Sequence, residues 1–264
     1  MPQHPARLAA EDLTLGYERR IVAEGLSIAV PDGGFTAIVG PNACGKSTLL
    51  RALARLLTPK EGTVVLDGRA AHDHPPKDFA RQVGLLPQTA SAPDGITVRE
   101  LVGRGRFPHQ TWWRPWTAED TSAVELALEQ TATVALAERR VDELSGGQRQ
   151  RVWVAMALAQ QAGILLLDEP TTFLDIAHQV ELMDLFAELN RGGVTVVAVL
   201  HDLNHAARYA SHVIAMCAGE VRASGAAREV VTAELVEEVF GLRCIVIDDP
   251  ETGTPLVVPR APSL

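Results

Sequence analysis

The stretch that decides the fold runs Gly40-Pro41-Asn42-Ala43-Cys44-Gly45-Lys46-Ser47-Thr48 and matches the pattern G-x-x-x-x-G-K-[ST]. An apolar run at 35–39 precedes it and predicts a strand, and leucines at helical spacing follow it over 46–57. Glycines let the backbone turn its N–H groups inward as an anion nest, and the following helix directs its positive N-terminus there. The sequence therefore predicts a triphosphate-binding loop, in which Lys46 reaches the β- and γ-phosphates and Ser47 ligates Mg²⁺.

Strand patterns alternate with helical patterns along most of the chain, which predicts an α/β fold on a mostly parallel sheet. Residues 96–140 hold no good strand and are rich in Ala, Leu and Glu, so a helical insertion is expected within about 90–160. Apolar segments around a turn predict a hairpin extension at about 242–260. We expect further strands at 13–15, 26–30, 62–68, 83–86, 164–167 and 194–200, helices at 148–161, 176–190 and 203–209, and hairpin strands at 244–248 and 256–258.

Composition restricts the function classes. The chain has 264 residues with 47% hydrophobic and 22% charged, which predicts a globular domain with a real core. The net charge of −9 argues against a general nucleic-acid binder. Because no apolar run approaches the ~20 residues that cross a bilayer, we expect a soluble cytoplasmic protein that acts at a membrane only through a partner. Its three cysteines indicate neither a disulfide framework nor a zinc site.

A second candidate element is Ile164-Leu165-Leu166-Leu167-Asp168-Glu169, an apolar strand that ends in two carboxylates. Ligands of open α/β sheets bind at the carboxyl ends of the strands. Asp168 would hold Mg²⁺ through its water shell, and Glu169 would polarise the attacking water as general base. The alternative is a strand that ends in acidic residues because a helix cap follows.

Three further positions fit the same chemistry. Gln88 and His201 each follow a predicted strand, where Gln88 could touch Mg²⁺ or water and His201 the γ-phosphate. A surface amide and a structural histidine are the alternatives. Ser145 caps a helix that begins with two glycines, which is either an ordinary helix start or a second anion site with a bare N-terminus.

Together these residues resemble the nucleotide-binding subunits of ABC transporters along nearly the whole chain. Phe173, where small residues are common, is a mild departure. The resemblance assigns residues 40–48 as the Walker A loop, residues 164–169 as Walker B and Gln88 as the Q-loop glutamine. It assigns Ser145, Gly146, Gly147 and Gln148 as the core of the signature motif. It further assigns Asp175 as the D-loop aspartate, His201 as the switch histidine and Tyr17 as the aromatic residue that stacks on adenine. A surface tyrosine in a loop is the alternative for Tyr17.

The resemblance implies a single P-loop ABC cassette over residues 1–264, with an N-terminal antiparallel β subdomain and an α-helical subdomain. It also implies a head-to-tail dimer with a second copy, in which Mg-ATP lies between the Walker A loop of one chain and the signature of the other. The implied location is peripheral, on the cytoplasmic face of the inner membrane. Implied partners are polytopic permease subunits and, indirectly, a periplasmic or surface substrate-binding protein, with no nucleic acid.

The insertion carries the features that point to a transporter type. Gly103-Arg104-Gly105-Arg106-Phe107-Pro108-His109 precedes Trp112, Trp113 and Trp116, with Arg104, Arg106 and Arg114 between the aromatics. Aromatic residues with arginines are typical of interfaces, so the region from Gln88 to Trp116 predicts the permease contact. Alternatively, the tryptophans cover the core of the insertion. The Gly-Arg-x-Pro-His pattern is similar to ATPases of ferric-siderophore, haem and cobalamin importers, with the ferric-siderophore members most similar.

Two rival functions remain at this point. One is a soluble ABC protein of translation, DNA repair or cofactor assembly, and the other is a scaffold that binds nucleotide without turnover. The presence of Glu169 and His201 argues against a scaffold that does not hydrolyse nucleotide. Separately, Cys44 lies near Lys46 and a helix N-terminus, which predicts a lowered thiol pKa and ready alkylation; an inert buried thiol is the alternative.

Overall fold

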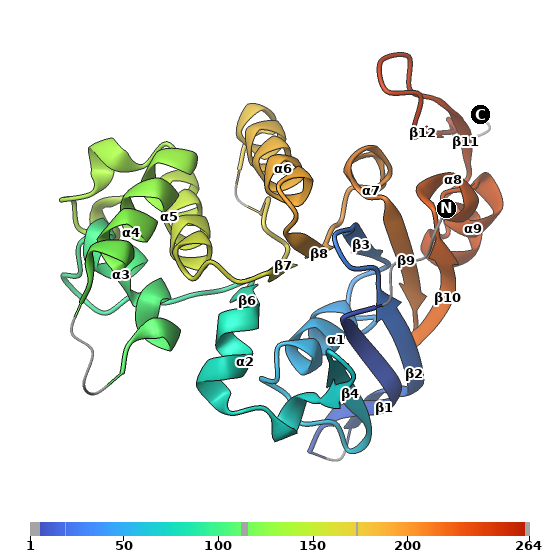
Figure 1. Ribbon diagram of the computed structural model, residues 1–264. Helices are drawn as coiled ribbons and strands as arrows, with labels where there is room; N and C mark the ends of the chain where they lie inside the picture. The colour runs from blue at the N-terminus through green and yellow to red at the C-terminus, as the bar shows by residue number, and fades with distance from the viewer. Residues whose placement is uncertain (1–5, 19, 112–115, 173, 262–264) are drawn as a thin grey trace. The chain divides into compact units, whose positions relative to one another are not determined.

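The computed structural model describes residues 6–18, 20–111, 116–172 and 174–261. The chain forms two compact units. Figure 1 shows their helices and strands. The first combines Met1–Asp73 with Thr195–Leu264, and the second is His74–Val194. Among the described residues, no helix is both long and apolar enough to cross a membrane.

An antiparallel sheet in the first unit confirms the expected N-terminal β part. Its strand order is β2-β1-β4-β5, and the register shifts of β1 against both neighbours mark irregularities in this long strand. Alternate residues of β2 are buried, so one face of the sheet packs on the core. The strands are β1 (Leu8–Tyr17), β2 (Arg20–Val30), β4 (Glu61–Leu66) and β5 (Arg69–Ala70), followed by the 3₁₀ turn Ala71–Asp73.

Parallel strands in the same unit position the predicted phosphate loop. β3 (Phe35–Val39) is fully buried and lies parallel to both β8 (Thr195–Val199) and β9 (His212–Cys217). Ile38 pairs with Val199, and Val39 pairs with Ala215. Because the three strands are parallel, the segments that follow them all begin at the carboxyl-end edge of the sheet. The elements β10 (Glu220–Gly225), α1 (Lys46–Leu53) and α7 (Leu203–Tyr209) complete this part.

The C-terminal hairpin is confirmed. β11 (Cys244–Asp248) and β12 (Pro255–Pro259) pair antiparallel, with Val246 opposite Val257. Before it come α8 (Ala227–Val230) and α9 (Ala233–Phe240). These two short helices, together with β9 and β10, were not among the predicted elements.

The second unit combines two parallel strands with the helical insertion. β6 (Val83–Leu86) pairs with β7 (Ile164–Asp168) in register, and α3, α4 and α5 pack on one another. Capping boxes at Thr97 and Thr117 begin α3 and α4, so local side chains fix where both helices start. The helices are α2 (Pro76–Gln82), α3 (Val98–Gly103), α4 (Ala118–Gln130), α5 (Gly146–Ala159) and α6 (Ile176–Arg191), with 3₁₀ segments at Arg104–His109 (η2), Val134–Leu136 (η3) and Val141–Glu143 (η4).

The helix after the phosphate loop ends earlier than its leucine spacing predicted. α1 stops at Leu53, and Arg55 adopts a left-handed φ of 60°. The Leu56 N–H then bonds back to the Arg51 carbonyl at 2.8 Å, which closes the helix end as in a Schellman motif. Leu56 is exposed, so its place in the apolar pattern was misleading.

Candidate nucleotide-binding and hydrolysis site

The predicted phosphate loop is curled tightly after β3. Gly40 has a φ of 154° and Gly45 a φ of 107°, and Ala43 between them is left-handed at 61°. A Cβ added at Gly40 would lie 2.1 Å from the carbonyl oxygen of Met216, which no side chain tolerates. Glycine at position 40 is therefore required by the close approach of β9.

Lys46 lies within the curl of this loop. Its side chain is buried, and Nζ donates to the carbonyl oxygens of Gly40 and Pro41, each at 2.8 Å. An ammonium has three donors, so these bonds leave one for a ligand. Buried cations are stable only with such partners, and the arrangement fits an anionic phosphate above the loop.

The other predicted residues of the first unit lie on α1, at the end of β1 and just after β8. Ser47 is half-buried at the start of α1, and Thr48 is buried. Tyr17 ends β1 with an exposed ring, and its hydroxyl accepts from Arg51 Nη1 at 3.3 Å. His201 is exposed and follows Leu200, whose N–H bonds to the Ile38 carbonyl at 3.1 Å.

The prediction of a lowered thiol pKa at Cys44 is wrong. Burial raises the pKa of the Cys44 thiol above its ordinary value, and the charge of Lys46 and backbone hydrogen bonds offset burial only in part. The sequence argument counted the helix N-terminus and the lysine but could not count desolvation.

Alkylation of Cys44 is accordingly expected to be slow. With iodoacetamide at neutral pH, we expect Cys44 in the folded chain to label at least about tenfold more slowly than in the urea-unfolded chain, because the thiolate is the nucleophile. Peptide mass spectrometry over time measures both rates. Equal rates in the two states would contradict the assignment, and Mg-ATP should change the slow rate little.

In the second unit, Gln88 and Glu169 come together although they are 81 residues apart. The Gln88 amide Nε2 donates to Glu169 Oε2 at 2.7 Å. Asp168, the last residue of β7, is buried, and Glu169 directly after it is left-handed with a φ of 52°. A left-handed non-glycine residue at a strand end is strained and is typical of functional sites.

The predicted helix start at Ser145 is confirmed, but its N-terminus is not bare. Ser145 Oγ accepts from the Gln148 N–H at 3.3 Å, and Gln148 Oε1 accepts from the Ser145 N–H at 3.1 Å. This capping box leaves Gly146 and Gly147 to supply first-turn N–H groups to a ligand. Gly147 lies close to Leu174: a Cβ added at Gly147 would be only 3.3 Å from Leu174 Cδ2, so there is little space for a side chain.

Asp175 caps the helix α6. Its Oδ1 accepts from the His178 N–H at 2.9 Å and lies 2.7 Å from His178 Nδ1. The backbone hydrogen bond from His178 is the main cause that lowers the pKa of Asp175. Sequence reasoning assigned no role to Gln179, whose amide Nε2 donates to the carbonyls of Thr171 and Leu174 in the preceding loop. Phe173 lies outside the described residues.

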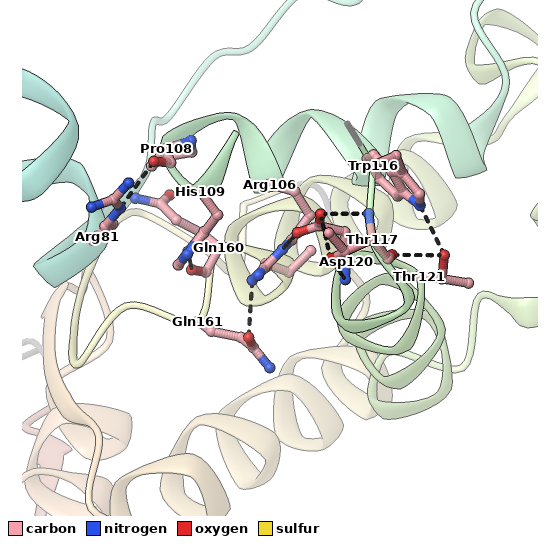
Figure 2. A network of polar contacts seen from close by, with 11 residues as sticks. Arg81, Arg106, Pro108, His109, Trp116, Thr117, Asp120, Thr121, Gln160 and Gln161 are labelled. Atoms are coloured by element: carbon pink, nitrogen blue, oxygen red, sulfur yellow. Dashed lines mark hydrogen bonds and ion pairs between the residues drawn. The ribbon is translucent and has the colours of Figure 1, made fainter. Parts of the chain in front are cut away.

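A groove of about 780 Å³ opens on the helical part of the second unit. Trp116 is 48% exposed, with its Nε1 donating to Thr121 Oγ1 at 2.8 Å (Figure 2). Phe107 is 64% exposed, and Lys77 Nζ lies 4.9 Å from its ring centroid. The groove is lined by Arg99, Glu100, Gly103, Arg104, Phe107, Gln110, Trp116, Thr121, Val124 and Glu125.

Arg106 does not belong to this exposed surface, contrary to the prediction. Its side chain is 4% exposed, and its Nε lies 2.9 Å from Asp120 Oδ1 (Figure 2). Nη1 donates to the Ala159 carbonyl and to Gln161 Oε1, each at 2.9 Å. Arg106 is thus a buried link between η2, α4 and the end of α5. Trp112, Trp113 and Arg114 lie outside the described residues.

The predicted residues are divided between the units. Tyr17, residues 40–48 and His201 belong to the first, and Gln88, Asp168, Glu169, the signature and Asp175 belong to the second. The first unit offers a buried lysine ammonium inside a curled loop, and the second offers a carboxylate that is hydrogen-bonded to an amide.

Comparisons with known proteins identify the family of this chain. The ABC transporter family model matches residues 23–172. The chain is 58% identical over 260 residues to the ferric enterobactin transport ATP-binding protein FepC of Escherichia coli (strain K12), covering 98% of this chain and 96% of that protein. It is 50% identical to the probable siderophore transport system ATP-binding protein YusV of Bacillus subtilis (strain 168), covering 96% and 92%.

Solved structures show the same fold. An inward-facing structure described as a metal-chelate type ABC transporter matches with a TM-score of 0.82 and 28% identity, over 97% of this chain and 98% of that one. The ATP-binding cassette MJ0796, solved as a dimer in a post-hydrolysis state with ADP and Pi, matches with a TM-score of 0.75 and 29% identity, over 84% and 99%. The chain therefore belongs to the ABC transporter family, as one of its ATP-binding subunits that hydrolyse ATP.

Proposed function

We propose that this chain energises import of a ferric siderophore, or of a related iron, haem or cobalamin complex, across a bacterial cytoplasmic membrane. The observation that carries the proposal is the 58% identity with the ferric enterobactin protein over nearly the full length of both chains. Cobalamin import proteins of Halobacterium salinarum are less similar, at 41% identity over 90% of this chain, which favours the siderophore class. In this proposal residues 1–264 are one nucleotide-binding domain, with the insertion at about 90–160 and the extension at about 242–260.

The proposed working unit is a head-to-tail pair of copies. ATP would lie between residues 40–48 of one copy and the Ser145–Gln148 helix start of the other, and Tyr17 would stack on adenine. The buried ammonium of Lys46 and the glycine-dependent curl at Gly40 support phosphate binding. MJ0796, which is 29% identical, has been solved as a dimer, which supports the pairing.

The residues present also fit Mg²⁺. Ser47, Asp168 and Gln88 offer a hydroxyl, a carboxylate and an amide oxygen, the hard ligands that this ion prefers. When bound, Mg²⁺ would neutralise the charge that develops on the phosphates. Glu169 is proposed to accept the proton of the attacking water, with His201 beside the γ-phosphate and Asp175 at the interface between copies.

Gln88 has a specific part in this scheme. Its Nε2 donates to Glu169 Oε2, so in this state one oxygen of the proposed base is already bonded. An oxygen that accepts this hydrogen bond is oriented toward Gln88 and has one lone pair fewer to offer to the attacking water. We infer that Gln88 restrains Glu169 until its amide turns toward Mg²⁺.

The groove with Phe107 and Trp116 is the proposed contact for a helix of the membrane subunit. Exposed aromatic rings beside Arg104 have the composition of an interface centre, and the groove lies on the segment that follows Gln88. The chain would thereby sit peripherally on the cytoplasmic face of the inner membrane, and a substrate-binding protein would act through the permease.

Truncation of one ring tests this contact. We expect Phe107→Ala to weaken co-purification with the permease by about tenfold or more, because aromatic anchors dominate interface energies. ATP hydrolysis by the free subunit should stay unchanged, since Phe107 is not one of the proposed catalytic residues. Val134→Ala, an exposed apolar residue outside the groove, is the matched control. Equal loss in both variants would contradict the docking site.

The cargo is tested by uptake. A strain that lacks its own siderophore ATPase should recover ⁵⁵Fe-siderophore uptake when it receives this chain with its permease and binding protein. Lys46→Ala should fail in the same strain, because the phosphate cradle loses its cation. Recovery of cobalamin uptake without iron uptake would overturn the siderophore assignment.

A further inference from the structure

The C-terminal hairpin presents an apolar face that the proposed function does not use. Ile245 is 42% exposed and Ile247 is 46% exposed, whereas Cys244 and Val257 on the opposite face are buried. Ile245 pairs with Val258 across the hairpin, and Ile247 pairs with Leu256. Cross-strand partners share a face, so four aliphatic residues form one stripe.

The two edges of the hairpin differ. The outer edge of β12 is covered by α7, because the Val257 N–H donates to Asn204 Oδ1 at 2.7 Å and its carbonyl accepts from Asn204 Nδ2 at 3.4 Å. The N–H and C=O of Val257 therefore point away from β11. In an antiparallel pair the N–H and C=O of the opposite residue, Val246, then point away from β12, toward the outer edge of β11. Within the described part of the chain, this sheet contains only these two strands. An apolar edge of this kind is a template for strand pairing.

The sequence along this edge is complementary to itself. Arg243, Ile245, Ile247 and Asp249 alternate with Val246 at their centre, and the ladder extends to both ends through Arg260 N–H to the Arg243 carbonyl and Asp249 N–H to the Thr254 carbonyl. In an antiparallel pair of two copies centred on Val246, Ile245 faces the partner's Ile247. Arg243 then faces the partner's Asp249, so an apolar contact is flanked by opposite charges.

We propose that β11 is a pairing edge for a second copy of this chain, with the two β11 strands antiparallel about a two-fold axis at Val246. The contact is isologous, as expected for a symmetric dimer. A slip by one residue would place Ile245 opposite the partner's Val246 on the wrong face, so the register is specified. Because this edge contains none of the proposed ATP ligands, the pairing should not require nucleotide, which separates it from the proposed ATP-dependent pair.

Several charges surround the edge. Arg243 lies 3.2 Å from Glu237, and both side chains are largely exposed, so this ion pair is weak and can be shared. Backbone hydrogen bonds, led by the one from Glu251, lower the pKa of Asp249 and keep it charged at neutral pH. Arg208 and Arg228 lie near the same turn, paired with Glu251 and Asp248.

Charge reversal tests the pairing. In nucleotide-free sedimentation equilibrium, Arg243→Asp and Asp249→Arg should each weaken dimerisation by about tenfold, because each creates two like-charge contacts across the axis. An equal mixture of the two variants restores both opposite-charge contacts and should dimerise like the unchanged chain. A chain that stays monomeric without nucleotide at the concentrations used for purification, or a mixture as weak as the single variants, would overturn the proposal.

Cross-linking tests the register. Val246→Cys should form a homodimer disulfide under mild copper-phenanthroline oxidation, because directly opposed residues meet the Cα spacing that a disulfide needs. Ile245→Cys alone should not, whereas a mixture of Ile245→Cys and Ile247→Cys should form a heterodimer. The unchanged chain is the control for the natural cysteines. A homodimer from Ile245→Cys that exceeds that from Val246→Cys would refute the register.

Discussion

Glu169→Gln is expected to reduce ATP hydrolysis by about 100-fold to 10,000-fold, the range attributed to a general base. The substitution keeps the shape of the side chain and an oxygen that can accept from Gln88 Nε2, so the local geometry at 2.7 Å should survive. What is lost is the capacity to take a proton from the attacking water. ATP should therefore stay bound between two copies, and the variant should accumulate as an ATP-loaded dimer.

Phosphate release and size-exclusion chromatography with Mg-ATP measure both effects. Glu143→Gln is the matched control, because Glu143 is an exposed acid of the same unit that lies outside the proposed site. Turnover in Glu169→Gln within threefold of the unchanged chain would place the base at another residue. A loss of hydrolysis together with loss of ATP binding would indicate a folding defect instead.

Local patterns account for much of what could be predicted. The bounds of β3, β6, α7 and β11 agree with the sequence expectation, since each is a short apolar or helical run between turn or polar residues. The phosphate loop was predictable for the same reason, because Gly40 and Lys46 act within one contiguous segment. The helix α1 was predicted too long, since exposed Leu56 fits the periodicity but follows the left-handed Arg55.

Properties that depend on burial by distant segments could not be predicted. Arg106 was assigned to an exposed aromatic surface, but its partners Asp120 and Gln161 come from other parts of the chain. Cys44 was expected to be acidic, but desolvation dominates its pKa. Hydrogen bonding between Gln88 and Glu169 was likewise not deducible from spacing, although both residues were assigned to the site.

Asp120→Ala is expected to be the most destabilising single substitution that we predict, at about 3–5 kcal/mol, because it leaves the Arg106 guanidinium buried without its ionic partner. Asp120 also completes the capping box of α4 through Thr117, and the loss of that cap adds to the effect. Thermal unfolding should show a Tm lowered by about 10 °C. Asp142→Ala, which breaks the exposed pair with Arg140, is the control and should change the Tm by about 2 °C or less.

The pH dependence separates a charge effect from a packing effect. Burial alone would raise the pKa of Asp120, but the hydrogen bonds from Arg106 and Thr117 outweigh it and the pKa lies below its ordinary value. The stabilisation by its charge is therefore complete above the unfolded pKa of about 3.9 and declines as the pH falls through the folded pKa. The difference in stability between the unchanged chain and Asp120→Ala should shrink over that acidic window.

If Arg106→Met is combined with Asp120→Leu, both buried charges are removed, and the double variant should be more stable than Asp120→Ala. A double variant as unstable as Asp120→Ala, with no change in the difference at acidic pH, would assign the loss to packing and capping instead of the ion pair.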